Sequence, residues 1–161
     1  MDMATGMLKK KDHLLEILEE LALCMELNGE NDFKVRAYKK GAQALLATSE
    51  SLEDVAAKKV KVAGIGDGLI AVISEYLKTG EVAELTKLKA KIAPVVFELI
   101  ELPGLGAKKA LLLHEELGVQ SLGELEYACR ENRLAQIKGF GEAMQAKVLK
   151  AIEERRQNEG K

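Results

Sequence analysis

Three short glycine motifs are the parts of this sequence whose spacing suggests chemistry. A Gly-apolar-Gly triplet occurs at residues 64–66, 104–106 and 139–141, at intervals of 40 and 35 residues. Glycines permit a tight bend and let a ligand approach the backbone closely. A helix that starts directly after the bend presents N–H groups without intrahelical partners, at the positive end of its dipole. Each triplet therefore predicts a backbone anion site, suited to a nucleic-acid phosphate and independent of base sequence.

The charges beside the triplets differ from one copy to the next. Lys108 and Lys109 follow the second triplet, and Lys138 precedes the third, whereas Asp67 follows the first. Asp67 places a negative charge where a phosphate would sit, unless it serves only to cap the next helix. One such triplet can simply form a corner between helices, so it is the repetition that favours a binding role.

The overall composition favours an all-helical globular protein. The 161 residues are 47% hydrophobic and only 4% aromatic, with a formal net charge of -2. That charge argues against coating nucleic acid by bulk electrostatics, but it allows a few placed phosphate contacts. No apolar run is long enough to span a membrane. The isolated residues Cys24, Cys129, His13 and His114 form no zinc-ligand set, so we expect reduced thiols and a cytoplasmic, nucleoid-associated protein.

Apolar periodicity predicts the helices that must position the triplets. We expect Asp32, Ser51 and Ser121 to cap helices, and Pro94 to lie in a first turn. Three phenylalanines are expected in the core, namely Phe33, Phe97 and Phe140. The expected helices cover about 12–27, 33–47, 52–58, 69–77, 82–91, 94–101, a segment ending at Gly118, 122–131, and a last helix that begins at the third triplet.

Several segments, taken in order, resemble the N-terminal region of family X DNA polymerases, especially bacterial ones. The triplets themselves resemble the helix-hairpin-helix motif. The resemblance also rests on the segment 28–38, on Leu77-Lys78-Thr79-Gly80, on Leu102-Pro103 before the second triplet, and on Lys138 and Glu142 around the third. It implies an all-α fold in which a helical lyase-like domain with the first hairpin, residues 1–91, precedes a tandem helix-hairpin-helix domain, residues 92–161.

The same resemblance indicates which enzymatic parts this sequence lacks. In family members with lyase activity, a lysine attacks an abasic sugar through a Schiff base. That lysine matches Val72 here, and a second pocket lysine matches Gly68. A valine cannot form an imine, so we expect no lyase chemistry. The carboxylate-bearing polymerase palm is absent as well.

The remaining site assignments are partly implied by the resemblance. Lys34 and Tyr38 match a phosphate-pocket lysine and a nearby tyrosine. No organic cofactor is expected, but family hairpins bind a monovalent cation, Na⁺ or K⁺, through backbone carbonyls, which here would be those of Val60, Val62, Ile65, Ile100, Leu102 and Leu105. The full set of predicted DNA-phosphate residues is Gly64, Gly66, Gly68, Gly104, Gly106, Lys108, Lys109, Gly139, Gly141, Lys34, Tyr38 and Lys39.

These observations predict a non-catalytic DNA-binding protein without sequence preference, which favours gapped, nicked or 5′-phosphorylated DNA in a repair or nucleoid context. Three alternatives stay open. One is an active 5′-deoxyribose-phosphate lyase that uses another lysine. Another is a fragment of a longer family X polymerase. The last is a scaffold that recruits repair proteins through its acidic first helix.

Overall fold

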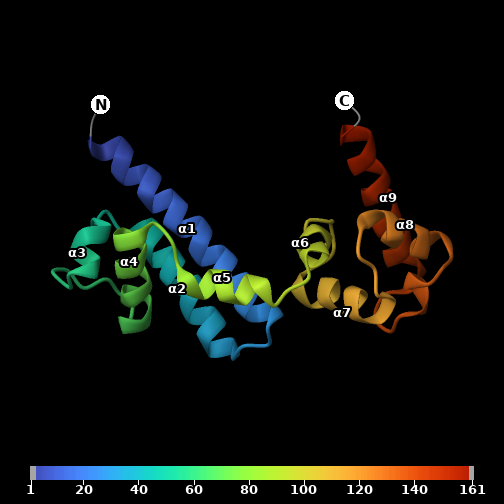
Figure 1. Ribbon diagram of the computed structural model, residues 1–161, viewed down its shortest axis with the longest axis horizontal. Coiled ribbons are helices and arrows are strands. Elements are labelled where there is room, and N and C mark those ends of the chain that lie inside the picture. The colour runs from blue at the N-terminus through green and yellow to red at the C-terminus, as the bar shows by residue number, and fades with distance from the viewer. Residues whose placement is uncertain (1–2, 160–161) are drawn as a thin grey trace. The chain divides into compact units, whose positions relative to one another are not determined.

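The computed structural model describes residues 3–159, and within that range every regular element is a helix (Figure 1). The prediction of an all-α fold is therefore confirmed. The chain divides into two compact units, Met1–Ile92 and Ala93–Lys161. None of the helices in residues 3–159 combines the length and the apolar character that a membrane crossing requires.

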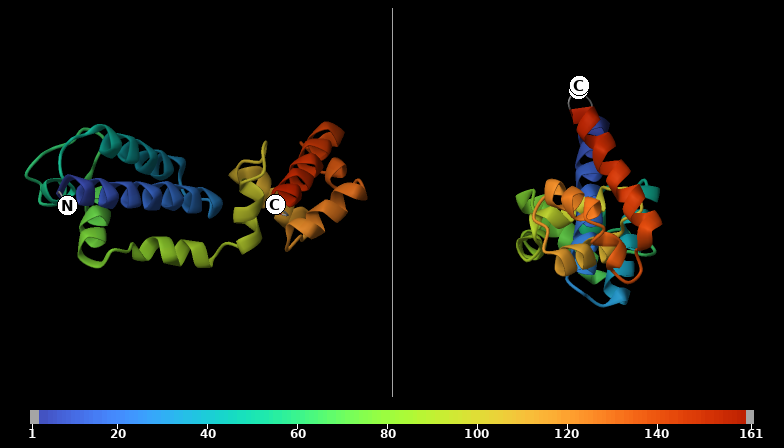
Figure 2. Two further views of the ribbon diagram at one scale, coloured as in Figure 1. Left: turned by 90° about the horizontal axis from the view of Figure 1, so that it is seen from above. Right: turned by 90° about the vertical axis from the view of Figure 1, so that its right-hand side faces the viewer.

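The first unit is built around one long helix. In the view from above in Figure 2, α1 lies between α2 and α5, and it contacts both. The α1 face that points inward consists of Leu14, Leu18, Leu21 and Met25, none of which is exposed. The helices of this unit are α1 (Met3–Leu27), α2 (Asp32–Ala47), α3 (Leu52–Ala56), α4 (Asp67–Thr79) and α5 (Ala83–Ala90).

The first helix begins earlier than its apolar pattern predicts. The repeat of buried side chains marks its start at about Asp12, but α1 begins at Met3. Residues 3–11 contain no proline and only one glycine, so nothing in them interrupts a helix. Periodicity therefore located only the part of α1 that carries the repeat of buried apolar side chains.

The starts of α2 and α3 follow standard capping chemistry. Asn31, rather than the predicted Asp32, caps α2, because its side-chain oxygen accepts a 2.7 Å hydrogen bond from the Phe33 N–H. Asp32 is instead the first helical residue, where a carboxylate is favoured by the helix dipole. Ser51 caps α3 as predicted, and its hydroxyl accepts a hydrogen bond from the Asp54 N–H.

Phe33 is not a core residue, so that prediction is wrong. Its side chain is 80% exposed, and the Arg36 guanidinium lies 5.9 Å from its ring centroid. The buried face of α2 is set by Val35, Ala42 and Leu45. A residue two positions before Val35 is rotated about 200° around the helix, so it points away from the core. Phe97 and Phe140 are half-buried.

The second unit packs four helices and one short 3₁₀ turn around a leucine core. Ser121 caps α8 as predicted, since its hydroxyl accepts a hydrogen bond from the Glu124 N–H, and the Glu124 carboxylate accepts one from the Gln120 N–H. Leu99, Leu113, Leu125 and Leu134 are wholly buried. The elements are α6 (Pro94–Ile100), α7 (Ala107–Leu117), α8 (Leu122–Arg130), η1 (Leu134–Gln136) and α9 (Gly141–Glu159).

A buried carboxylate joins α8 to α9. Glu126 is only 7% exposed, and its two oxygens face Arg130 at 2.9 Å and Arg156 at 2.6 Å. Arg130 also pairs with Glu153 at 3.0 Å. Ion pairs with both arginines, and the hydrogen bond that Arg130 donates, compensate for the desolvation of this carboxylate. The network fixes how α9, the helix after the third glycine triplet, packs on α8.

Candidate nucleic-acid interface

All three glycine triplets form the same four-residue turn. In each turn the carbonyl of the first residue accepts a 3.1 Å hydrogen bond from the N–H of the fourth: Val62 from Ile65, Leu102 from Leu105, and Ile137 from Phe140. The third residue has a φ of 95° at Gly64, 86° at Gly104 and 93° at Gly139. A positive φ at the third position defines a type II turn and explains why glycine stands there.

The second glycine of the first two triplets begins a helix. Gly66 and Gly106 have nearly the same backbone angles, φ -95° and ψ -178° against φ -91° and ψ -178°. Neither provides a side-chain cap. The carbonyl of Gly66 accepts its helical bond from Ile70, and that of Gly106 from Ala110. The amides before Ile70 and Ala110 therefore lie in the first turn, where a helix leaves its N–H groups without intrahelical partners.

The fold itself does not require glycine at Gly66 or Gly106. Their backbone angles are open to any residue, and a Cβ atom added at either position would meet nothing within 4 Å. Serine or aspartate would stabilise a helix start better than glycine does. Because glycine has no side chain, a ligand can reach the amides at the helix start.

The third turn differs from the other two. Gly141 has a φ of 76° and is already the first residue of α9. The apolar residue between the glycines is buried in the first two turns, at 9% exposure for Ile65 and 5% for Leu105, but Phe140 is only half-buried. The sequence triplet therefore repeats three times, whereas its detailed geometry repeats twice.

The first turn is held against α2 by two glycines. A Cβ atom added at Gly41 would stand 2.1 Å from the Leu69 Cδ2 atom, and one at Gly64 would stand 3.2 Å from the Ala44 Cβ atom. Gly41 is buried in the middle of α2, where glycine weakens a helix. The close approach of the first hairpin explains why a glycine stands there.

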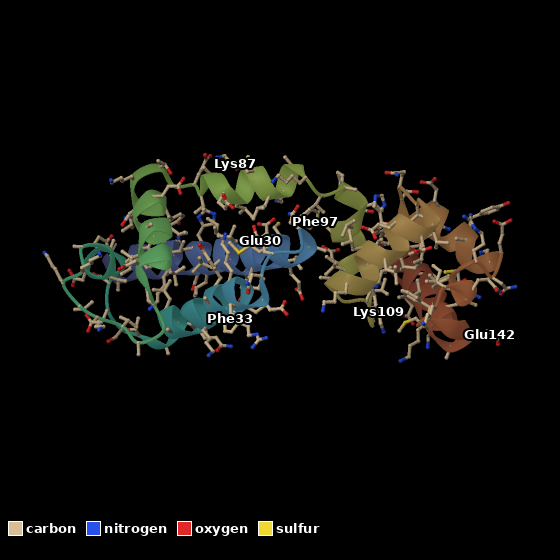
Figure 3. All side chains as sticks on the ribbon, turned by 90° about the horizontal axis from the view of Figure 1, so that it is seen from below. Glu30, Phe33, Lys87, Phe97, Lys109 and Glu142 are labelled. Atoms are coloured by element: carbon tan, nitrogen blue, oxygen red, sulfur yellow. The ribbon has the colours of Figure 1, made fainter. Side chains whose placement is uncertain are left out.

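The charges around the turns set the second hairpin apart. Asp67 follows Gly66 and forms a 3.4 Å ion pair with Lys58, so the first helix start carries a carboxylate. Glu142 follows Gly141 in the same way. The second hairpin has Ala107 at this position, followed by Lys108 and Lys109, which are exposed and make no ion pair with any described residue. Figure 3 shows Lys109 and Glu142 beside their respective helices.

The three predicted residues on α2 do not share one face. Gly41, which contacts the first hairpin, lies seven residues after Lys34 and three after Tyr38. Lys34 and Tyr38 therefore lie on the same side of the helix as Gly41. Lys39 lies two residues before Gly41 and instead lines a groove between α1 and α2, together with Leu15 and Leu46. The structure thus brings Lys34 and Tyr38, but not Lys39, to the side of the hairpin.

Lys34 and Tyr38 each have a carboxylate in their surroundings. Glu30 lies 4.0 Å from the Lys34 ammonium, one turn earlier in the chain. Tyr38 is half-buried, and that burial, followed by the negative charge of Glu84, raises the pKa of its hydroxyl. Tyr38 therefore stays protonated near neutral pH and can donate a hydrogen bond to an anion.

The positions matched to the lyase lysines lie on α4. Val72 is 9% exposed and belongs to the buried face of the helix with Leu69, Ile73 and Tyr76. Gly68 is exposed in the first turn of α4, and a Cβ atom added there would meet nothing within 4 Å. Neither position provides an amine.

The three residues whose carbonyls were predicted to hold a cation at the first hairpin lie beside one cavity. Val60, Val62 and Ile65 line one cavity of about 360 Å³. The Val62 and Leu102 carbonyls each accept one hydrogen bond within their turns, which leaves a second lone pair. In the described part of the chain, no loop or turn hydrogen bond is accepted by Val60, Ile65, Ile100 or Leu105. These oxygens are therefore available as hard ligands.

Sequence reasoning missed one feature in each unit. The first is the exposed pair of Phe33 and Arg36, whose ring and guanidinium offer a face on which an unpaired base can stack. The signal that could have revealed this pair was the position of Phe33, two residues before the buried Val35 and therefore on the opposite side of α2. The second is a buried amide, Gln145, behind the third hairpin. No local pattern points to it.

Comparison with known proteins agrees with this geometry. Residues 9–82 match a helix-hairpin-helix domain family, and residues 96–154 match a SAM-like helix-hairpin-helix tandem family. Both matches are to helix-hairpin-helix models, and the tandem match covers the second and third turns of this all-α chain. Its sequence is related to the N-terminal region of family X DNA polymerases, as the resemblance of its motifs predicts. It is 38% identical over 145 residues to the DNA polymerase/3′-5′ exonuclease PolX of Bacillus subtilis (strain 168). That match covers 90% of this chain but only 25% of the relative.

Proposed function

We propose that this chain binds DNA by holding the sugar-phosphate backbone at its hairpins, independently of base sequence. The observation that carries the proposal is the pair Gly66 and Gly106. Both glycines stand where the fold would accept a side chain and where a helix start exposes its amides. A phosphate that approaches those amides needs the space that a side chain would fill.

The proposal accommodates the net charge of -2. Backbone amides supply the positive potential at each turn, and Lys108 and Lys109 add to it at the second hairpin. Only a few lysines then neutralise phosphates, so few counterions are released from the DNA on binding. We expect non-specific affinity with a Kd on the order of 10⁻⁴ to 10⁻⁶ M near physiological salt.

The test replaces Gly106 with serine. Serine adopts the same backbone angles and caps α7, so Gly106→Ser should maintain or raise the unfolding free energy while it lowers duplex affinity. The matched control is Gly123→Ala in α8, which adds one methyl group with only ordinary contacts, 3.7 Å and 3.9 Å away. If Gly106→Ser binds duplex DNA like the wild-type chain, the hairpin amides are not the binding site.

We further propose that gapped, nicked or 5′-phosphorylated DNA is preferred, as in DNA repair. The support is the α2 face that carries Lys34 and Tyr38 and continues to Gly41 at the first hairpin. A terminal phosphate has more negative charge and fewer steric neighbours than an internal one, so an ammonium and a hydroxyl favour it. Binding to gapped DNA with and without the 5′-phosphate, in wild type and in Lys34→Ala, tests this preference.

We propose that the chain has no lyase activity. The position matched to the nucleophile holds Val72, whose side chain lies in the core, and the position matched to a second pocket lysine holds Gly68. Schiff-base chemistry needs an accessible neutral amine at the sugar carbon. Borohydride trapping on abasic DNA should therefore yield no covalent adduct, and an adduct would show that another lysine acts.

A monovalent cation, Na⁺ or K⁺, is proposed at the first two hairpins. The carbonyls of Val60, Val62 and Ile65 would hold it at the first hairpin, and those of Ile100, Leu102 and Leu105 at the second. Such an ion would add positive charge between the turn and a phosphate. Replacing K⁺ by a large organic cation at constant ionic strength should weaken duplex binding if this ion contributes.

A further inference from the structure

The third hairpin is backed by a buried amide side chain. Gln145 lies in the second turn of α9 and is 8% exposed. Together with Glu126 it makes up the buried polar side chains in the described part of the chain. Burial of an amide is unfavourable unless its hydrogen bonds are made, so its partners show what it holds in place.

Gln145 connects the helix after the third turn to the segment before it. Its carbonyl oxygen accepts a 2.9 Å hydrogen bond from the Ala135 N–H, and its NH₂ group donates a 2.9 Å hydrogen bond to the Asn132 side-chain oxygen. Ala135 belongs to η1, which leads directly into the turn. The turn itself, Ile137–Phe140, lies between these two anchored points.

Asn132 is held in an uncommon conformation at the other end of this connection. Its φ is 61°, a left-handed value that asparagine tolerates better than most residues. It terminates α8, since its N–H donates to the Cys129 carbonyl and the next N–H, that of Arg133, donates to Ala128. The Gln145 amide is therefore hydrogen-bonded both to the residue that ends α8 and to the 3₁₀ turn.

The other two hairpins are closed differently. Their turns are plugged by Ile65 and Leu105, which are buried, whereas Phe140 of the third turn is only half-buried. The third turn also has Gly141 in the left-handed region, unlike Gly66 and Gly106. Because its apolar residue is less buried and its backbone differs, the third turn needs another restraint. Hydrogen bonds are directional, whereas apolar packing is not.

We infer that Gln145 is the positioning residue of the third hairpin: its amide fixes the Gly139–Gly141 turn relative to α8 and so aims that turn at DNA. The inference rests on the proposed function, because it presumes that the third hairpin contacts a phosphate. Gln145 itself does not touch DNA in this assignment.

The experiment compares duplex-DNA binding by three folded variants of the full chain. Gln145→Met keeps the length of the side chain but removes both hydrogen bonds. Asn132→Gly removes one bond and retains the left-handed backbone without strain. Gly141→Val disables the third hairpin, because valine is strongly disfavoured at that positive φ. Circular dichroism and a urea midpoint confirm that each variant is folded at the temperature of the binding assay.

We expect Gln145→Met to lower duplex affinity about three- to tenfold, and Asn132→Gly by a smaller factor, since one directed hydrogen bond is worth about that much. In the Gly141→Val background, Gln145→Met should cause no further loss. A purely structural role would reduce the urea midpoint and leave the affinity of the folded protein unchanged. If Gln145→Met does not fold, the duplex affinity of Asn132→Gly distinguishes the positioning role from a purely structural one.

Two results would overturn the inference in distinguishable ways. If Gly141→Val and Gly106→Ser weaken binding but the folded Gln145 and Asn132 variants bind normally, the positioning role is wrong and the proposed function stands. If none of the hairpin variants alters duplex binding, the proposed function fails, and the inference fails with it.

Discussion

Gly41 of α2 lies directly against Leu69 of α4, so closely that a methyl group at Gly41 would stand 2.1 Å from the Leu69 Cδ2 atom. Glycine normally costs a helix interior about 1 kcal/mol relative to alanine. Here the glycine allows the helix after the first hairpin to reach α2. A residue that weakens one helix therefore sets the position of the next hairpin.

The first prediction follows from that contact. Gly41→Ala should lower the unfolding free energy by about 1–2 kcal/mol, because buried Leu69 must leave its rotamer and the gain in helix propensity is smaller. Urea unfolding measures the change. Gly123→Ala in α8 is the control and should be neutral or stabilising. An equal effect at both positions would contradict the close packing of Gly41.

A second prediction concerns the carboxylate at the first hairpin. Asp67→Asn removes a negative charge from the start of α4 and releases Lys58 from its 3.4 Å ion pair. Duplex affinity should rise severalfold, while α4 loses about 0.3–1 kcal/mol of favourable interaction between the carboxylate and the helix dipole. Binding and stability therefore change in opposite directions. Unchanged affinity would indicate that phosphate does not approach this helix start.

A third prediction asks whether the lyase position can be restored. Val72→Lys places an amine at the position matched to the nucleophile, and burial disfavours its charged form, which lowers its pKa and makes it a better nucleophile. We expect this variant to be less stable than wild type and to form a borohydride-trapped adduct with abasic DNA. Val72→Met controls for the longer side chain and should form none. Should Val72→Lys fold and also form none, the matched position is not next to the sugar.

A fourth prediction uses the two buried thiols. Burial, followed by the charge of Glu126, raises the pKa of Cys129 to about 11, and burial is also the main cause of the raised pKa of Cys24. Thiolates are the reactive form, so neither cysteine should be alkylated in the folded protein near neutral pH. Mass spectrometry before and after addition of urea measures the labelling. Rapid labelling of the folded chain would contradict their burial.

The same raised pKa of Cys129 makes stability depend on pH in a defined direction. The unfolded thiol ionises near pH 9.0, whereas the folded one stays protonated until about 11. The folded state therefore binds more protons than the unfolded state between these values, and stability falls as the pH rises through that window. Cys129→Ala should reduce this fall, as a urea series at increasing pH would show.

Turns and helix caps could be predicted from the sequence because they depend on residues that are close together in the chain. The turn glycines Gly64 and Gly104 and the cap Ser121 each depend on residues within a few positions. Phe33 was misplaced because the core face of α2 is defined by a helical phase that a single aromatic side chain does not reveal. The amide of Gln145 could not be foreseen, since its partner Ala135 lies ten residues away across the turn.

The nearly identical helix starts at Gly66 and Gly106 have one more consequence. A main-chain amide does not titrate at physiological pH and, unlike a lysine ammonium, it cannot be acetylated. The contact that we propose is therefore carried by groups that pH and acylation leave unaltered, and neither change should abolish it. Control over such a contact would have to come from geometry, by displacement of the turn, rather than from chemical neutralisation of its charge.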